Sequence, residues 1–228
     1  MKPNDNKKLN IEINGKTYSR IPIKTHFIKV NESLDNIIQQ YVIPEIKKDD
    51  IVFISQKVSA LCVGNVVYKK DLKLSRSAKF LSKFTAETST GPAVGNHPYK
   101  MQIAINSAGL PRILFAAFCG AIGKIFKIKG IFYKVAGNQI NQIDGFCDAG
   151  FEDYMEMGIL GFKNCDPMCE EIKNKHGFSC AIVDINDIGG NLLGATNNLD
   201  KKLIIEILKD NPLGQGSQST PIGIIREV

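Results

Sequence analysis

The sequence has no long apolar segment, no dense set of cysteines and no common nucleotide-binding motif. Its longest apolar stretch, Ile113 to Gly123, stops at Lys124 and is too short to span a bilayer. The N-terminal segment, Met1 to Asn10, is polar and lacks the apolar core of a secretory signal. These absences predict a cytoplasmic protein with no membrane partner.

The six cysteines are too sparse for a disulfide scaffold, and we expect them to be reduced. Cys165 and Cys169 lie one helical turn apart and His176 follows them, which allows a zinc site. The paired two-residue spacing of common zinc motifs is absent, however. The favoured interpretation is therefore that the cysteines are buried as small hydrophobic residues.

Basic residues outnumber acidic ones, 29 to 23, which gives a formal net charge of +6. The densest basic stretch, Lys69 to Lys83, can supply a positive field for an anionic nucleotide or acidic substrate. A solvated helix face is the commoner explanation of such a stretch. Nucleic acid is not expected as a partner, because no aromatic platform or recognition-helix motif accompanies the lysines.

The 228 residues, 43% of them hydrophobic and 23% charged, are typical of a globular protein with one large domain or two lobes. Strand and helix patterns mingle throughout, which predicts an α/β or α+β fold with mixed sheets. We expect an N-terminal α/β lobe over residues 1–110 and a C-terminal α/β lobe over 111–228, or one intertwined domain.

Local patterns predict the individual elements. Strands are expected at residues 51–55, 63–68, 131–135, 180–183 and 221–226. Helices are expected from residue 31, around 78–84, and at 111–126, 166–175 and 200–209. The helix at 111–126 is predicted to be buried because it is almost entirely apolar.

Acidic and amide side chains stand beside glycines at the ends of several apolar runs. Asp144 closes one such run, Asp184 and Asp187 close another, and Gln215 lies between two glycines before the last predicted strand. Carboxylate and amide oxygens at strand ends are the hard donors that Mg²⁺ or Mn²⁺ requires. Asp144, Asp187 and Gln215 are therefore the candidate metal ligands, with Asp184 competing with Asp187.

Each candidate has a structural alternative. An aspartate before glycine often closes an Asx-turn. Lys57 follows the strand at 51–55 and is either a phosphate-binding residue or a solvated lysine at an element end. His97, in the Gly/Pro loop 88–98, is a candidate for acid–base chemistry, although a lone loop histidine is more often a bystander. No serine, cysteine or histidine set has the spacing of a nucleophilic triad.

Two further segments accompany these turns. They are Asp50-Ile-Val-Phe-Ile-Ser-Gln-Lys-Val-Ser59 with Gly64-Asn-Val-Val67, and Leu213-Gly-Gln-Gly-Ser-Gln-Ser-Thr-Pro-Ile-Gly-Ile-Ile-Arg226. Together with the turns at Asp144, Asp187 and Gln215, and in this order along the chain, these segments resemble the gamma-glutamyl ligase family of deazaflavin coenzyme F-420 biosynthesis. The resemblance runs from about Ile21 to the end of the chain.

The resemblance implies a coenzyme F-420 gamma-glutamyl ligase-like fold and a homodimer. It also implies that GTP or ATP activates a small-molecule carboxylate, to which an amino acid such as glutamate is joined through an amide bond. Mg²⁺ or Mn²⁺ would be held by Asp144, Asp187 and Gln215.

The chain also departs from the family pattern. Asn31-Glu32-Ser33-Leu34 stands where the family has a Gly-Asp-Asp-Leu loop, and the turn at Asp144 is spelled differently. The segment after Asp187 lacks the family's arginine. The missing arginine favours a non-catalytic metal- or nucleotide-binding protein as the alternative. A third alternative is a metal-assisted amidase, in which the same ligands activate water.

Overall fold

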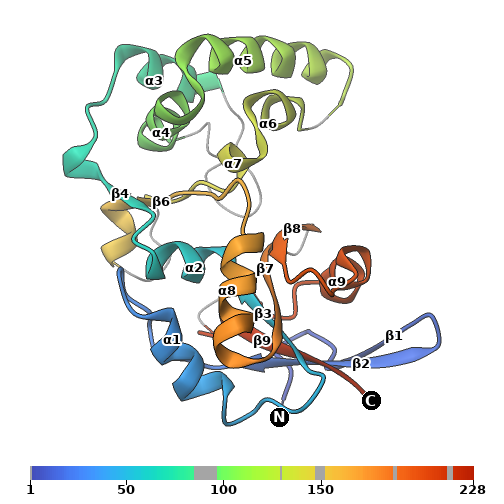
Figure 1. The fold of residues 1–228 in the computed structure, drawn as a ribbon. Helices are drawn as coiled ribbons and strands as arrows, with labels where there is room; N and C mark the ends of the chain where they lie inside the picture. The colour runs from blue at the N-terminus through green and yellow to red at the C-terminus, as the bar shows by residue number, and fades with distance from the viewer. Residues whose placement is uncertain (1, 85–96, 129, 147–151, 187–188, 215–217) are drawn as a thin grey trace. The chain divides into compact units, whose positions relative to one another are not determined.

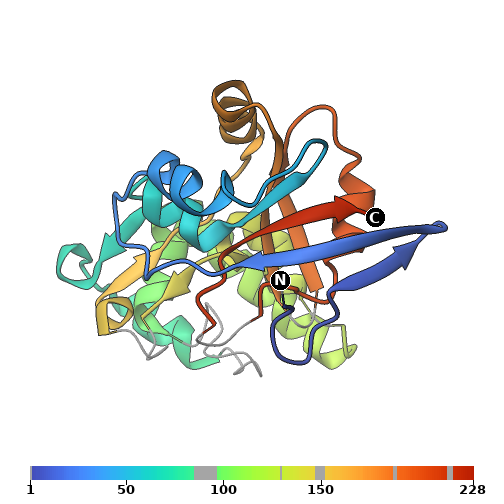
Figure 2. The ribbon, with the colours of Figure 1, turned by 90° about the horizontal axis from the view of Figure 1, so that it is seen from below.

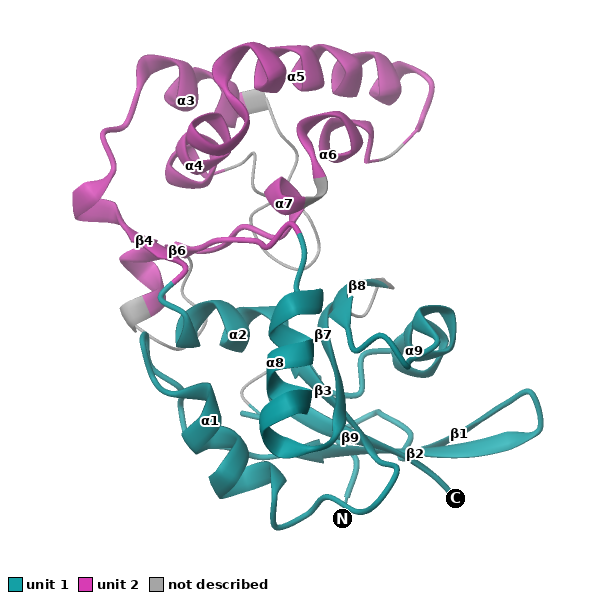
Figure 3. Ribbon diagram, in the orientation of Figure 1, with its two compact units in different colours: residues 1–64, 164–228 teal, residues 65–163 magenta. Residues whose placement is uncertain are grey.

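The structure, a computed structural model, describes residues 2–84, 97–128, 130–146, 152–186, 189–214 and 218–228. The chain divides into two compact units (Figure 3). Unit 1 comprises residues 1–64 and 164–228, and unit 2 comprises residues 65–163. The divisions fall at residues 64 and 163 rather than at 110, because the last third of the chain returns to the sheet that the first third begins.

Unit 1 is built on a six-stranded sheet with the order β1-β2-β9-β3-β7-β8 (Figure 1). The strands are β1 (Asn10–Ile13), β2 (Lys16–Ile23), β3 (Ile51–Ser55), β7 (Ser179–Asn186), β8 (Gly189–Ala195) and β9 (Ile222–Glu227). Only β3 and β7 pair in parallel, and the other neighbours are antiparallel. The predicted mixed α/β class is confirmed. The β1–β2 hairpin, in blue, extends beyond the other strands (Figure 2).

Helices cover both faces of this sheet. They are α1 (Leu34–Ile37), which continues as the π-helical turn η1 (Ile38–Val42), α2 (Gln56–Cys62), α8 (Asp166–His176) and α9 (Lys201–Leu208). Ala181 and Val183 of β7 pack in one core with Ile204 of α9. The Cys180 thiol instead donates to the carbonyl of Cys169 in α8. Because side chains alternate along a strand, α8 and α9 lie on opposite faces.

Capping residues set the ends of the predicted helices in unit 1. The Ser33 side chain accepts from the Asn36 N–H at the start of α1, and Asp200 accepts from the first turn of α9. Gly177 ends α8 with a left-handed φ of 83°. The helices predicted from residue 31, at 166–175 and at 200–209 are thus confirmed.

An ion pair closes the junction between β3 and β9. The guanidinium of Arg226 donates through Nε to Asp50 Oδ1 at 2.8 Å and through Nη2 to Asp50 Oδ2 at 2.7 Å. The Asp50 side chain is 1% exposed and that of Arg226 is 18% exposed. The bond to Asp50 raises the pKa of Arg226. This fork therefore helps to hold β3 and β9 side by side.

Unit 2 combines a three-stranded sheet with a set of short helices. The strands, in the order β4-β6-β5, are β4 (Val66–Tyr68), β6 (Met157–Ile159) and β5 (Asp144–Gly145). The helices are η2 (Lys69–Asp71), α3 (Arg76–Leu81), η3 (Ser82–Phe84), α4 (Pro98–Ala108), α5 (Leu110–Ile125), α6 (Ile131–Ala136), α7 (Asn138–Asn141) and η5 (Glu152–Met155). Met101 and Ile103 of α4, Ile113 of α5 and Phe146 form the centre of its core.

The strand predicted at 131–135 is wrong, because these residues form α6. Glycines with positive φ, 79° at Gly130 and 117° at Gly137, bound the helix. A Cβ on Gly123 of α5 would lie 2.6 Å from the end of the Ile131 side chain and 3.0 Å from the Ile128 carbonyl oxygen, so glycine at this position favours the close approach. The apolar run Ile131–Val135 has strand-like composition, and packing against α5 overrides it.

The prediction that residues 111–126 form a buried helix is half right. A helix forms, as α5, but Phe115 is 60%, Phe118 62% and Ile125 77% exposed. In the described ranges, no single helix is both long and apolar enough to cross a membrane. Only α4 and α5 taken together, across a bend of 117°, meet that length and composition.

We predict that Arg226→Met lowers the free energy of unfolding by about 3 kcal/mol, since it leaves the Asp50 carboxylate buried without its partner. Urea unfolding followed by circular dichroism measures the loss. Lys16→Ala, which removes the exposed pair with Glu227 on the neighbouring strand, is the control and should change the midpoint little. An equal loss in both variants would contradict the role given to the buried fork.

Candidate functional site

Three strand ends of unit 1 meet at one edge of its sheet. Ser55, the last residue of β3, pairs with Val183 of the parallel strand β7. The Ser55 N–H donates to the carbonyl of Pro221, immediately before β9, at 2.9 Å. The carboxyl ends of β3 and β7 and the amino end of β9 therefore lie together. In open sheets with parallel strands, ligands bind beyond such carboxyl ends.

Lys57 lies at this edge, in the first turn of α2. Ser55 caps α2 by accepting from the Val58 N–H at 3.4 Å, so the chain passes directly from β3 into the helix. The Lys57 side chain is half-buried. A lysine beside the positive end of a helix raises the local potential, which favours an anion there. Phosphate binding by Lys57 stays a prediction.

Asp184 also belongs to this edge, but as part of a strand and not of a turn. It is paired with Asn191 across β7 and β8 and is half-buried. Ser55 pairs with Val183, so Asp184 comes one residue after this pair in β7, and Lys57 comes two residues after it in α2. Two chain segments far apart in the sequence, with Lys57 in one and Asp184 in the other, thus adjoin the same paired strands.

Two of the predicted metal ligands lie outside the described residues. Asp187 falls between the end of β7 at Asn186 and the start of β8 at Gly189. Gln215 falls between Gly214 and the segment that leads into β9. The ligand role assigned to both residues stays a prediction.

Asp144, the third predicted ligand, lies in unit 2. It opens β5, pairs with Ile159 of β6, and accepts the Gly145 N–H through Oδ1 at 2.8 Å. The same oxygen lies 3.8 Å from Lys100 Nζ, whose side chain is 5% exposed. The Asp144 carboxylate is therefore bonded to the N–H of the next residue and forms an ion pair with a buried lysine. Sequence reasoning did not identify Lys100, whose one signal was its charge within an otherwise uncharged stretch.

His97 is adjacent to this ion pair and precedes α4. Its ring stacks on Phe146, with centroids 5.4 Å apart and planes 3° from parallel. Among the described residues, none forms a hydrogen bond with its buried Nδ1. Burial, followed by the charges of Lys100 and Lys69, lowers the pKa of His97 below its ordinary value of 6.5. His97 is therefore a neutral imidazole at pH 7, able to accept a proton.

Lys69 adds a second cation beside this group. Its Nζ lies 5.5 Å from the ring centroid of Tyr99 and 3.2 Å from Glu156 Oε1. We name the group the Lys100 cluster: Lys69, His97, Tyr99, Lys100, Asp144 and Phe146. Two ammonium groups around a neutral imidazole favour an anionic ligand next to a proton acceptor.

The zinc alternative has no support in the described ranges. Cys165 and Cys169 are buried, and burial raises the pKa of Cys165 to about 12. His176 Nε2 lies 3.0 Å from Asp35 Oδ1. Within these ranges, no group of three or more His, Cys, Asp or Glu residues is placed to hold a metal ion. The three described cysteines of α8 and β7 behave as small buried hydrophobic residues.

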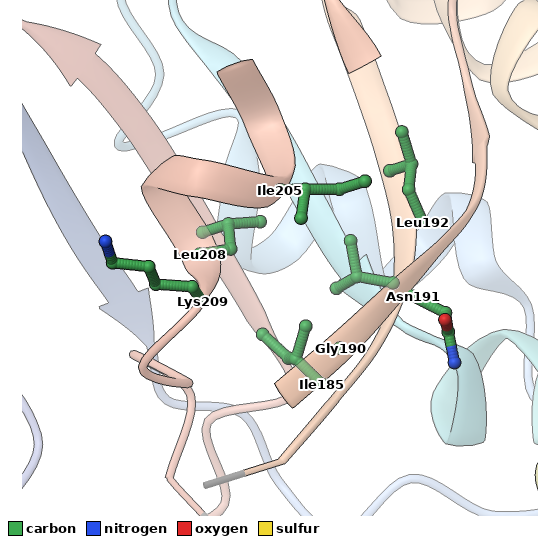
Figure 4. Close-up of a pocket in the computed structure, with 8 residues that line it drawn as sticks. Ile185, Gly190, Asn191, Leu192, Ile205, Leu208 and Lys209 are labelled. Carbon is green, nitrogen blue, oxygen red and sulfur yellow. The ribbon is translucent and has the colours of Figure 1, made fainter. Parts of the chain in front are cut away.

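A small apolar hollow lies between β7, β8 and α9 (Figure 4). Val183, Ile185, Leu192, Ile205 and Leu208 line it, and its free space is roughly 30 Å³. This space admits a water molecule but not a nucleotide. The hollow is therefore a packing gap and not the candidate site.

We predict that the contribution of His97 to the free energy of unfolding becomes smaller in acid. Because its native pKa is depressed, the unfolded chain binds the proton first, so stability falls as pH drops from about 6.5 through the native pKa. NMR titration of the imidazole protons measures that value. Lys69→Met should raise it, since it removes a nearby positive charge, while Lys79→Met is the control. A native pKa at or above 6.5 would contradict the environment described here.

Comparison of the sequence with models of known protein families finds no match, and comparison with curated proteins finds none either. No family is assigned to the chain on this basis. The residues of functional interest are those that the fold gathers: Lys57 and Asp184 at the sheet edge of unit 1, and the Lys100 cluster of unit 2.

Proposed function

We propose that the protein is a metal- and nucleotide-dependent ligase with a coenzyme F-420 gamma-glutamyl ligase-like fold. One observation carries the proposal. The carboxyl ends of β3 and β7 and the amino end of β9 share one edge of the sheet. Lys57 and Asp187 follow the first two strands, and Gln215 belongs to the segment before the third. Strand ends that are far apart in the sequence thus come to one edge, and the candidate residues follow or precede these strands along the chain.

In the proposed reaction the acceptor carboxylate attacks the γ-phosphorus of GTP or ATP, and the nucleoside diphosphate leaves. The amine of an amino acid, such as glutamate, then attacks the acyl carbon, and inorganic phosphate leaves. Asp187 and Gln215 supply oxygen ligands for Mg²⁺ or Mn²⁺, which would offset phosphate charge. Lys57 supplies a point charge for a phosphate oxygen.

Asp144 is the further carboxylate that the resemblance implies as a ligand. In the structure its cationic partner is Lys100, at 3.8 Å. A divalent ion bound by Asp144 would take the place of that ammonium group as the partner of the carboxylate. We therefore test Asp144 by its own variant, Asp144→Asn, separately from Asp187 and Gln215.

A second candidate is a non-catalytic metal- or nucleotide-binding protein of the same fold. The absence of arginine from the segment 188–196, directly after Asp187, favours it. A metal-assisted amidase would hydrolyse an amide without a triphosphate. Product formation that requires a triphosphate separates the ligase from the amidase. A homodimer is expected for the ligase from the family it resembles.

We predict that GTP or ATP raises the thermal midpoint only with Mn²⁺ or Mg²⁺, and that Asp187→Ala and Gln215→Ala abolish the shift. A ligand at a hundredfold excess over its Kd stabilises the native state by about 2.7 kcal/mol. Asp49→Asn is the matched control, because Asp49 is exposed and its φ of 67° suits asparagine. No shift with any nucleotide in the wild type would exclude the ligase.

We predict that Lys57→Met weakens nucleotide binding about tenfold and leaves binding of the metal alone unchanged, because the lysine would meet a phosphate and not the ion. Isothermal titration calorimetry with Mn²⁺ and then with nucleotide measures the two steps. Lys48→Met, at an exposed lysine of the same unit, is the control. Unchanged nucleotide affinity would make Lys57 a solvated lysine at the end of an element.

A further inference from the structure

A stripe of large apolar side chains is exposed along α5. Leu114, Phe115, Phe118, Ile122 and Ile125 are 49%, 60%, 62%, 39% and 77% exposed. We call them the α5 stripe. With 3.6 residues per turn they occupy one side of the helix, opposite the buried face. The opposite face packs on the core of unit 2 through Ile113 and Ala116 and on α6 through Gly123.

The stripe continues past the end of the helix. Phe126 is 69% and Ile128 55% exposed. The Ile128 N–H donates to the Gly123 carbonyl at 2.8 Å and the Lys127 N–H to the Lys124 carbonyl at 3.2 Å, which is a Schellman ending. Lys127 adopts the left-handed φ of 57° at the position where glycine is usual. A lysine therefore stands beside the apolar side chains where the backbone would favour glycine.

Basic residues predominate in the part of the sequence that contains this stripe. No Asp or Glu occurs from Thr88 to Ile143. That segment contains six basic residues: Lys100, Arg112, Lys124, Lys127, Lys129 and Lys134. Unit 2 as a whole has 13 basic and 7 acidic residues, whereas unit 1 has 16 of each. The whole net charge of +6 thus resides in the unit that carries the α5 stripe.

We propose that the α5 stripe binds the surface of an anionic lipid bilayer. Apolar and aromatic side chains on one face of a helix, with Lys and Arg beside them, are the pattern of helices that lie in a membrane interface. The stripe enters the acyl boundary, and Lys124 and Lys127 contact lipid phosphates or carboxylates. With 16 residues α5 is too short to span a bilayer but can lie on one.

Charge favours an anionic bilayer over a second copy of the chain as the partner of the α5 stripe. Two α5 stripes packed together would bring together two units that each carry a net charge of +6, and this repulsion opposes self-association. The stripe itself has no polar side chain among its five members, so it offers no directional hydrogen bonds to a protein partner. An anionic bilayer satisfies both the apolar stripe and the basic residues next to it.

Co-sedimentation of the full chain with vesicles tests the proposal. Vesicles of phosphatidylcholine with phosphatidylserine should bind the protein, and phosphatidylcholine alone should bind it weakly. Phe115→Ser/Phe118→Ser should reduce binding more than tenfold by loss of apolar burial. Lys124→Gln/Lys127→Gln should reduce vesicle binding about fivefold for each lysine replaced. High salt should also weaken vesicle binding by the wild type, because it screens the charges.

Matched controls are Phe80→Ser, at another exposed phenylalanine of unit 2, and Lys47→Gln/Lys48→Gln on unit 1. Both should bind vesicles like the wild type, and all variants should keep the wild-type thermal midpoint. Absence of vesicle binding, or equal binding by the stripe variants, would overturn the proposal. The alternative is that the stripe is an interface between two copies of the chain, and light scattering tests it. In that case the wild type is a dimer that does not bind lipid, and Phe115→Ser/Phe118→Ser converts it to a monomer.

Discussion

The pairing of β9 with β3, closed by the fork between Arg226 and Asp50, is the constraint on which unit 1 depends. It places the end of the chain in the middle of the sheet, between β2 and β3. A carboxylate that is 1% exposed is tolerated there because a guanidinium occupies both of its oxygens. Gly223 lets the Phe53 ring lie against β9, where a Cβ would approach that ring to 2.4 Å. Residues 51–54 and 222–225 thus meet as neighbouring strands.

Charge is partitioned between the two units, and this partition links the features of unit 2. The segment from Thr88 to Ile143 has no carboxylate, and Asp144 is the first one after it. That first carboxylate is the partner of the buried Lys100. Burial, with the charges of Lys100 and Lys69, lowers the pKa of His97, and the same acid-free segment contains α5. A unit with a net charge of +6 is suited to anionic ligands.

Local sequence was a reliable guide where one strong signal acted alone. The compact run 51–55 is β3, and the caps Asp200 and Gly177 mark α9 and α8 as expected. Local sequence was a poor guide where contacts with segments far apart in the chain decide the secondary structure or the role of a residue. Residues 131–135 look like a strand, but the glycine face of α5 admits them as a helix. Lys100 could not be recognised as a site residue, because nothing in the sequence indicates that its neighbour is Asp144.

The sequence by itself determined the class of the fold, the positions of β3, β7, β9, α8 and α9, and the types of side chain that stand at strand ends. These depend on periodicity, capping and turn chemistry, which act over a few residues. Only the tertiary structure decided that β3, β7 and β9 share an edge, that Lys100 pairs with Asp144, and which side of α5 is exposed. Such facts depend on contacts between segments far apart in the chain. Burial and charge are properties of those contacts and not of the local pattern.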